Sequence, residues 1–202
     1  MVVANNQSTD DTATTARVRG CRVVNVEKRS IAAARNGGAE IATGEVLCFM
    51  DADFAIHPQS YNVIDDFMSG GHYCGGATGA VLDRYSLGLR VTEIVMTASV
   101  RLVVVNSGIV FCRQDVFEEV GGYNEAKKYA EDVEFFRAMR NCGKKKGQKT
   151  ILGTRVPATI STRKFDKHGD RHVFRMFLWI PFRYGSYEKW IHAYWYDDKE
   201  RF

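Results

Sequence analysis

The sequence lacks several features that would set it apart from ordinary soluble proteins. No apolar run approaches the roughly 18 residues of a membrane-spanning helix. The first residues lack the basic and apolar regions of a signal peptide. Internal repeats and low-complexity tracts are also absent. We therefore expect a soluble, cytoplasmic protein, and leave open a peripheral contact of its C-terminus with the inner face of the membrane.

Clustered cysteines and a strong charge excess are missing as well. The five cysteines lie far apart, without a C-x-x-C pair, each in or beside an apolar segment. We interpret them as buried free thiols of a protein from a reducing compartment, in preference to disulfides or a zinc site. The net charge is only +4, with a pI of about 8.8. That weak basic excess suits an anionic substrate and does not indicate a nucleic-acid partner.

What remains is the composition and patterning of one α/β domain. The 202 residues are 45% hydrophobic and 26% charged, as in typical globular proteins. Strand-like and helix-like segments alternate through the first fifty residues, which predicts a parallel sheet covered by helices. We expect strands at 1–4, 21–26, 44–53, 72–82, 109–112 and 150–161, and helices at 10–19, 30–44, 58–69, 87–105, 113–120 and 131–142. Lys144 to Lys146 are interpreted as a solvated loop.

The most informative stretch is the predicted strand that ends in two aspartates. Val46 to Met50 is an apolar run too short for a typical helix, and it fits a strand buried on both faces. Asp51 and Asp53 follow, separated by the small Ala52. In open α/β sheets ligands bind beyond the carboxyl ends of strands, so this pair suits Mg²⁺ or Mn²⁺ carrying a phosphate. On so short a motif alone, a solvated turn is an equally good interpretation.

Four segments together resemble the family 2 glycosyltransferases, in the order in which that family has them. Each is a weak match alone, and the four in order extend from residue 2 to about residue 170. The segments are V-A-N-N-Q-S-T-D-D-T at 3–12, A-R-N-G-G with A-T-G-E at 34–45 before the D-x-D strand, G-G-Y-N-E with E-D at 121–132, and S-T-R-K with a later glycine at 161–169.

The resemblance implies a GT-A fold, a Rossmann-like α/β architecture with a mainly parallel mixed sheet. Members of the family bind a nucleotide-diphospho-sugar donor, usually with a divalent metal ion. By the same resemblance, Asn5 and Asp10 lie in the loop near the nucleoside. Arg35 and Asn36 lie close to the nucleotide and its diphosphate.

The remaining donor-site residues are also assigned by resemblance. Asp51 and Asp53 contact the ribose and the metal–diphosphate group, with Asp53 the stronger candidate for a metal ligand. His168 is a candidate third ligand, because some GT-A enzymes take a histidine from a late loop; a surface histidine is the alternative. Arg163 and Lys164 either clamp the diphosphate or are ordinary surface charges.

The resemblance makes Asp132 the general base and Glu131 its support. A carboxylate opposite the leaving nucleotide can take the proton of the acceptor hydroxyl as that oxygen attacks C1 of the sugar. A metal ion and a guanidinium can stabilise the charge that develops on the β-phosphate. The expected result is single displacement with inversion. Without the resemblance, the two acids would be read as a negatively charged helix start.

The sequence departs from the family pattern at its beginning. The family's first strand and helix have no counterpart before the Asn5 loop, and their absence would expose a sheet edge. Asn5 stands where the family has Asp, and Gln7 where it has Gly. A degenerate nucleotide-sugar binder or oligomer-forming relic is therefore the second hypothesis. An aspartate-nucleophile phosphatase is a weaker third, because Phe54 follows the second Asp where that class has Thr or Val.

We divide the chain into a GT-A domain at 1–170 and an aromatic, mainly helical extension at 171–202. The aromatic side chains of the extension favour packing on the core or a homodimer interface over a peripheral membrane surface. The acceptor is unidentified, either a saccharide or a lipid-linked molecule.

Overall fold

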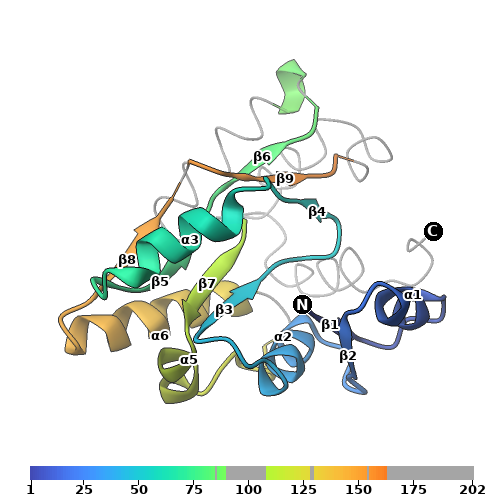
Figure 1. Ribbon diagram of the computed structural model, residues 1–202, viewed down its shortest axis with the longest axis horizontal. Coiled ribbons are helices and arrows are strands. Elements are labelled where there is room, and N and C mark those ends of the chain that lie inside the picture. The colour runs from blue at the N-terminus through green and yellow to red at the C-terminus, as the bar shows by residue number, and fades with distance from the viewer. Residues whose placement is uncertain (85, 90–107, 128–129, 154, 163–202) are drawn as a thin grey trace, which may run out of the picture.

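The computed structural model describes residues 1–84, 86–89, 108–127, 130–153 and 155–162, in which short strands alternate with helices (Figure 1). The predicted extension at 171–202, most of the predicted helix at 87–105, and Arg163, Lys164 and His168 lie outside these residues. The first elements are β1 (Val2–Asn5), α1 (Thr12–Val18), β2 (Arg22–Asn25), α2 (Ile31–Glu40), β3 (Val46–Phe49), β4 (Phe54–Ala55) and α3 (Ser60–Ser69). The later elements are β5 (Tyr73–Ala77), β6 (Ala80–Leu82), β7 (Val110–Arg113), α5 (Gln114–Val120), α6 (Glu131–Lys145), β8 (Lys149–Leu152) and β9 (Ala158–Ile160).

The described strands form three sheets, two of which have mixed strand directions, and this confirms the predicted α/β class. A four-stranded sheet has the order β3-β7-β5-β8, a three-stranded sheet has the order β4-β9-β6, and β1 pairs with β2. The β1–β2, β5–β8 and β6–β9 pairs are parallel, whereas β3–β7, β5–β7 and β4–β9 are antiparallel. The strand before the aspartates was expected in a parallel sheet, but its described partner, β7, runs antiparallel to it.

Burial on both faces of the four-stranded sheet explains its apolar, non-alternating strands. On one face, Leu47 and Cys112 pack with α5 and α6 in one core cluster. On the other face, Phe111 packs with Ile64 and Met68 of α3 in a second cluster. Adjacent strand residues such as Phe111 and Cys112 point to opposite sides, so both faces need apolar side chains. Figure 1 shows α3 on one side of this sheet and α5 and α6 on the other.

Local sequence signals account for most of the helix ends. The hydroxyl of Ser30 accepts a hydrogen bond from the Ala33 N–H at 3.4 Å and caps α2 as predicted. Gly20, with φ of +76°, follows α1, and Gly121, with φ of +79°, ends α5. Helix α2 ends at Glu40, however, four residues before the predicted end at Gly44.

The lysine-rich segment was wrongly predicted as a loop. Helix α6 continues through Lys145, and Lys146 is its C-cap. The Lys146 ammonium lies 2.7 Å from Glu119 and 3.5 Å from Asp115. Basic side chains at a helix C-terminus complement its dipole, and the acids of α5 add ion pairs. A charge run therefore ends the helix here without forming a solvated loop.

The cysteines are free, as predicted. Cys74, Cys112 and Cys142 are buried, while Cys21 and Cys48 are partly buried. Burial raises the pKa of the Cys48 thiol to about 11, so this thiol stays protonated at neutral pH.

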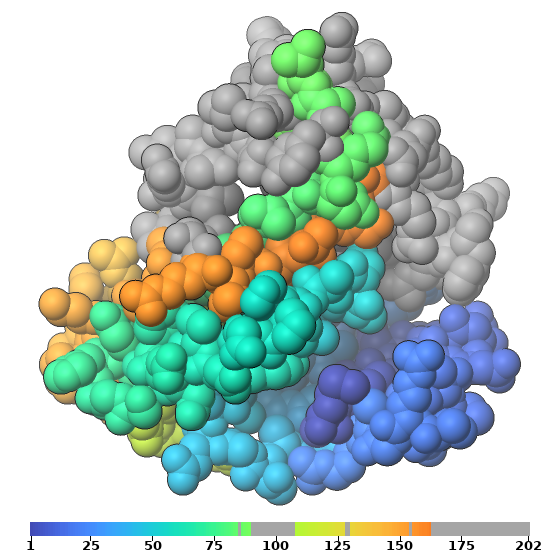
Figure 2. All heavy atoms as spheres, turned by 45° about the horizontal axis from the view of Figure 1, so that its top comes forward, coloured from blue at the N-terminus to red at the C-terminus, as the bar shows by residue number. Residues whose placement is uncertain are grey.

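Strands β1 and β2 form a small unit beside the main sheet. None of their residues belongs to either described core cluster. Helix α2 packs against both strands, and it also contributes Ala32 and Ala39 to the core cluster around Leu47. Figure 2 shows the first residues, in blue, gathered at one end of the visible face, away from most of α3 in teal. None of the described helices is long and apolar enough to cross a membrane.

Candidate active site

The two aspartates lie in the turn between β3 and β4. Asp51 and Asp53 are both exposed, and the backbone carbonyl of Asp51 accepts a hydrogen bond from the Phe54 N–H at 3.2 Å. Phe49, the last residue of β3, packs edge-on against Tyr123 with ring centroids 5.2 Å apart. The partly buried Phe49 ring packs on the core and fixes the end of the strand, so that the two carboxylates after it face solvent.

Arg35 joins this turn to the start of α6. Its Nη2 lies 3.2 Å from Oδ1 of Asp51, which is 16 residues further along the chain. Its Nη1 lies 3.2 Å from Oε1 of Glu131, which is 96 residues away. The Arg35 side chain is only 18% exposed, against 10% for Glu131 and 48% for Asp51. A planar guanidinium can donate to two carboxylates at once, so one side chain holds two distant motifs together.

The surroundings raise the pKa of both Arg35 and Glu131. Burial works to lower the pKa of Arg35, but Tyr123, Asp51, Glu131 and Asp132 outweigh it and raise that pKa. Burial, with help from the neighbouring acids, raises the pKa of Glu131 although Arg35 opposes this. Arg35 is therefore a fixed positive charge among carboxylates, and burial makes the ionised form of Glu131 costly.

Asp132 is half-buried in the first turn of α6. Its Oδ1 accepts a hydrogen bond from the Val133 N–H at 2.8 Å. The N-terminus of a helix stabilises negative charge, and Glu131 and Glu134 share this turn. Ala130, just before the helix, has φ of +55°, a left-handed conformation that costs a non-glycine residue free energy.

An aromatic platform supports Arg35. The guanidinium carbon lies 5.1 Å above the centroid of the Tyr123 ring. That ring is 2% exposed and stacks on Phe135 of α6 with centroids 4.2 Å apart. The Tyr123 hydroxyl is buried, and none of the described residues forms a hydrogen bond with it. Burial raises the pKa of that hydroxyl, which stays protonated.

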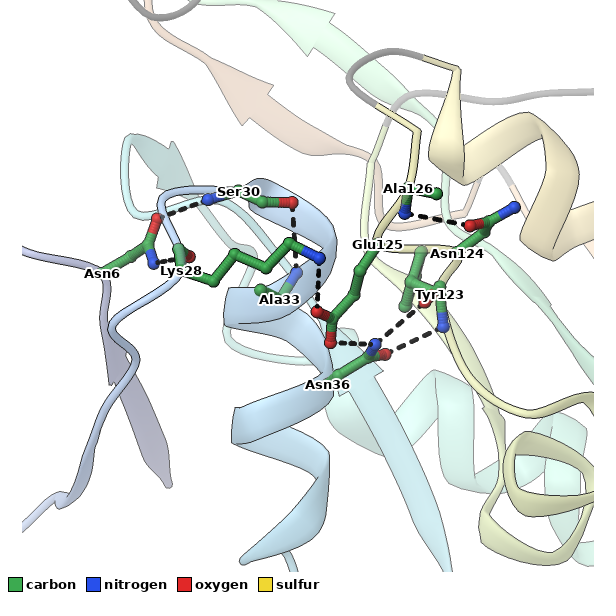
Figure 3. Close-up of polar contacts among 9 residues, drawn as sticks. All are labelled: Asn6, Lys28, Ser30, Ala33, Asn36, Tyr123, Asn124, Glu125 and Ala126. Atoms are coloured by element: carbon green, nitrogen blue, oxygen red, sulfur yellow. Dashed lines mark hydrogen bonds and ion pairs between the residues drawn. The ribbon is translucent and has the colours of Figure 1, made fainter.

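Asn36, the neighbour of Arg35, binds the segment after α5 (Figure 3). Its Nδ2 donates to the Tyr123 carbonyl at 2.9 Å and to Glu125 at 3.0 Å. Its Oδ1 accepts from the Tyr123 N–H at 2.8 Å. Lys28 donates to the other oxygen of Glu125 at 3.0 Å. These two donors hold the pKa of Glu125 below its ordinary value.

We call Lys28, Asn36, Tyr123 and Glu125 the clasp. Sequence reasoning placed Tyr123 and Glu125 inside a family motif without assigning them a role, and it passed over Lys28. The local sequence feature that indicates this contact is the Gly121-Gly122 pair, which lets the backbone come close to Asn36. A Cβ at Gly122 would lie 2.8 Å from Oδ1 of Asn36, so a side chain there would push the two segments apart.

The predicted nucleoside loop lies at the end of β1. Asn5 donates to Oδ1 of Asn25 at 3.0 Å, and Asp10 accepts a hydrogen bond from the Thr12 N–H at 3.0 Å. The hydroxyl of Thr12 also bonds to Asp10, and these contacts lower the Asp10 pKa. Gln7 has φ of +58°, in the place of the family's glycine. We call Arg35, Asp51, Glu131 and Asp132 the Arg35 cluster. None of the described hydrogen bonds or ion pairs joins Asn5 or Asp10 to it.

The described residues could bind a divalent metal ion only together with oxygen atoms of a bound ligand, such as a phosphate. Within the described part of the chain, no group of three His, Cys, Asp or Glu side chains could hold a metal alone. Asp53 is exposed and has no ion-pair partner among the described residues, so its oxygens are available. Mg²⁺ and similar ions commonly bind one or two carboxylates together with substrate phosphates. Asp51 and Asp53 have the chemistry for such a site.

A pocket of about 730 Å³ lies beside the clasp, between β2, α2 and α5. Asn36 and Glu125 line it, as do the apolar Val26, Leu47 and Phe117. Neither aspartate of the turn after β3 lines it, nor do Arg35, Glu131 and Asp132. The ion pairs of Arg35 are therefore not part of this pocket.

A family model matches the first part of the chain. Residues 1–98 match the model of glycosyl transferase family 2. Just under half of the chain is therefore similar to this family. The matched residues contain Arg35 and both aspartates of the D-x-D turn, whereas Glu131 and Asp132 lie beyond them. No curated protein matches the sequence.

Solved structures share the fold of this chain. Glucosyl-3-phosphoglycerate synthase from Mycobacterium tuberculosis, in complex with Mn²⁺, UDP-glucose and phosphoglyceric acid, matches with a TM-score of 0.56 and 18% identity. That match covers 85% of this chain and 64% of the other. S. aureus TarS 1–349 in complex with UDP-GlcNAc matches with a TM-score of 0.63 and 17% identity, over 80% of this chain and 49% of the other. The chain thus spans less than two thirds of the length of these solved chains.

Proposed function

We propose that the chain is an inverting glycosyltransferase that transfers a sugar from a UDP-sugar to an acceptor hydroxyl. The observation that carries this proposal is the position of Arg35, which pairs with Asp51 of the D-x-D turn and with Glu131 at the start of α6. Two segments with donor-site and general-base chemistry thereby meet at one side chain. The two solved structures of this fold contain UDP-glucose and UDP-GlcNAc, which favours uridine as the base.

In this proposal Asp53 and Asp51 would hold Mg²⁺ or Mn²⁺ together with the diphosphate of the donor. Bound there, the ion would supply positive charge that stabilises the leaving diphosphate. Asp53 is the main protein ligand, because Asp51 already accepts a hydrogen bond from Arg35. The exposure of both carboxylates lets a phosphate approach them from solvent.

Asp132 acts as the base. The acceptor oxygen forms a bond to C1 of the sugar and its proton passes to the Asp132 carboxylate, while the bond from C1 to the β-phosphate oxygen breaks. The electron pair of that bond leaves with UDP. Glu131 is shielded from the acceptor, because its carboxylate pairs with Arg35 at 3.2 Å and is buried.

Calorimetric titration tests the donor site. We expect UDP to bind more tightly than GDP, in a Mn²⁺-dependent manner, and we expect Asp53→Ala to abolish the metal dependence. Asp65→Ala, which removes an exposed carboxylate of α3, is the matched control and should bind like the wild type. Absence of binding to either nucleotide, in protein that is folded by circular dichroism, would overturn the proposal.

Hydrolysis of UDP-glucose and UDP-GlcNAc, with water as the acceptor, tests the base without a known acceptor. We expect Asp132→Asn to lower the rate by about a thousand-fold and to leave UDP affinity unchanged. A wild-type protein that binds UDP with Mn²⁺ but releases no sugar from either donor would favour the degenerate binder.

A further inference from the structure

The Asn36 carboxamide uses its hydrogen bonds within the protein. A carboxamide has two N–H donors and one acceptor oxygen. Both donors are used, one by the Tyr123 carbonyl and one by Glu125, and the oxygen accepts the Tyr123 N–H. No N–H of Asn36 remains for a nucleotide phosphate. Figure 3 shows the side chain pointing from α2 into the segment 123–125.

The partners of Asn36 are themselves fixed. Lys28 holds Glu125 from the opposite side, at 3.0 Å. The Lys28 carbonyl accepts a hydrogen bond from Asn6 at 2.7 Å, and Asn6 also accepts the Ser30 N–H at 3.1 Å. The segment 123–125 is therefore joined to α2 and to the loop that precedes it, so Tyr123 has little freedom to shift.

Tyr123 links the hydrogen bonds of Asn36 to Arg35 and to helix α6. Its backbone N–H and C=O are bound by Asn36, while its ring lies under the Arg35 guanidinium and stacks on Phe135. Phe135 is one helical turn after Glu131 on α6. The position of one ring thus affects both the guanidinium and the helix that begins with Glu131 and Asp132.

We propose that Asn36 is a positioning residue, which sets Arg35 and the start of α6 through Tyr123 and does not bind the donor. Its effect on turnover rests on the proposed function, whereas its effect on Arg35 does not. A side-chain amide paired with both backbone groups of one residue fixes that residue as a neighbouring strand would. Loss of the two donors leaves the Tyr123 carbonyl and Glu125 without their hydrogen bonds from Asn36.

The test uses a substitution that preserves size. Asn36→Asp keeps the acceptor for the Tyr123 N–H but removes both donors and faces the carboxylate of Glu125. The double variant Asn36→Asp/Glu125→Gln restores an N–H···O bond with reversed polarity and the wild-type net charge. Asn62→Asp, on the exposed surface of α3, makes the same change away from the site and is the control.

The first measurement is the exchange of the Arg35 guanidinium N–H with water, by NMR of protein labelled with ¹⁵N-arginine. The Arg35 signal is assigned by its loss in Arg35→Lys. We expect Asn36→Asp to speed this exchange by about tenfold, as the loss of one or two hydrogen bonds predicts, and the double variant to recover most of the protection. Unchanged exchange in Asn36→Asp would overturn the proposal, and it can be measured even if no donor binds.

The second measurement separates positioning from donor binding. We expect Asn36→Asp to lower kcat for UDP-sugar hydrolysis by about tenfold, with the Kd for UDP within about twofold of the wild type and partial recovery of kcat in the double variant. A fall in UDP affinity that accounts for the loss of rate would make Asn36 a donor ligand and overturn the proposal. Failure of the wild type to bind UDP would count against the proposed function only.

Discussion

Among single residues, Glu131 matters most to the candidate site, because its buried carboxylate is ionised only at a cost that Arg35 partly offsets. Glu131 is 7% exposed and faces Arg35 at 3.2 Å. Burial makes its ionised form costly, and the neighbouring Asp132 and Asp51 add repulsion. Arg35 offsets only part of this cost, so the pKa of Glu131 is raised. The folded protein consequently holds the proton of Glu131 to a higher pH than the unfolded chain does.

This balance predicts a pH-dependent stability difference for Glu131→Gln. Below the unfolded pKa of about 4.5, Glu131 is neutral in both states and behaves like glutamine. As the pH rises through the raised folded pKa, the wild type loses unfolding free energy that the variant keeps. The variant should therefore gain stability relative to the wild type between pH 4.5 and 7, measured by urea unfolding. A difference that is constant or that falls with pH would contradict the shift.

At the scale of elements, α6 delivers the two acids, and its first residue follows a strained one. Ala130 has φ of +55°, so its Cβ crowds the following carbonyl. The helix after it is well supported, since Phe135, Phe136 and Met139 are all buried in the core beneath the sheet. The strain is therefore local to the turn that aims Glu131 and Asp132, and the packing of α6 maintains it.

Substitution of glycine at two positions of this element should have opposite effects. Ala130→Gly removes the Cβ from a left-handed residue and should stabilise the protein by about 1 kcal/mol. Ala138→Gly, within the same helix, should destabilise it by about 1 kcal/mol, because glycine is a poor helix former. Chemical denaturation of both variants provides the measurement. Equal destabilisation by both would show that the Ala130 conformation carries no strain.

At the scale of the whole molecule, stability is unevenly distributed. The main sheet is packed on both faces, by α3 on one side and by α5 and α6 on the other. Strands β1 and β2 form a two-stranded sheet that contributes no residue to the described core clusters. Isolated two-stranded sheets are marginal in water. Helices α1 and α2 both pack against this unit, and α2 also carries Arg35 and Asn36.

Hydrogen exchange measured by mass spectrometry should reveal this division. We expect the amides of β1 and β2 to exchange at least about tenfold faster than those of β7, because local opening there costs less free energy than global unfolding. Peptides from α1, whose amides are likewise outside the core clusters, provide the comparison for the same end of the molecule. Protection of β1 equal to that of β7 would show that the whole described fold opens as one unit.

Much of the fold followed from local sequence. Apolar runs, glycine stops and the Ser30 cap placed most described strands and helices within a few residues. The direction of the strand before Asp51 did not follow, because its partner β7 lies more than 60 residues away and strand pairing is not encoded locally. The lysine segment at 144–146 was misjudged for a similar reason, since Glu119 and Asp115, its partners, belong to another helix.

The amino-acid sequence alone is enough to name the candidate side chains: the D-x-D pair, Arg35, and the acids at 131–132. How these side chains are combined follows only from the folded chain. Packing brings α2, β3 and α6 together, so that Arg35 pairs with Asp51 and Glu131 while the adjacent Asn36 turns to Tyr123 and Glu125. The reason is geometric: neighbouring residues on a helix point in different directions, and what each one meets depends on segments far away in the chain.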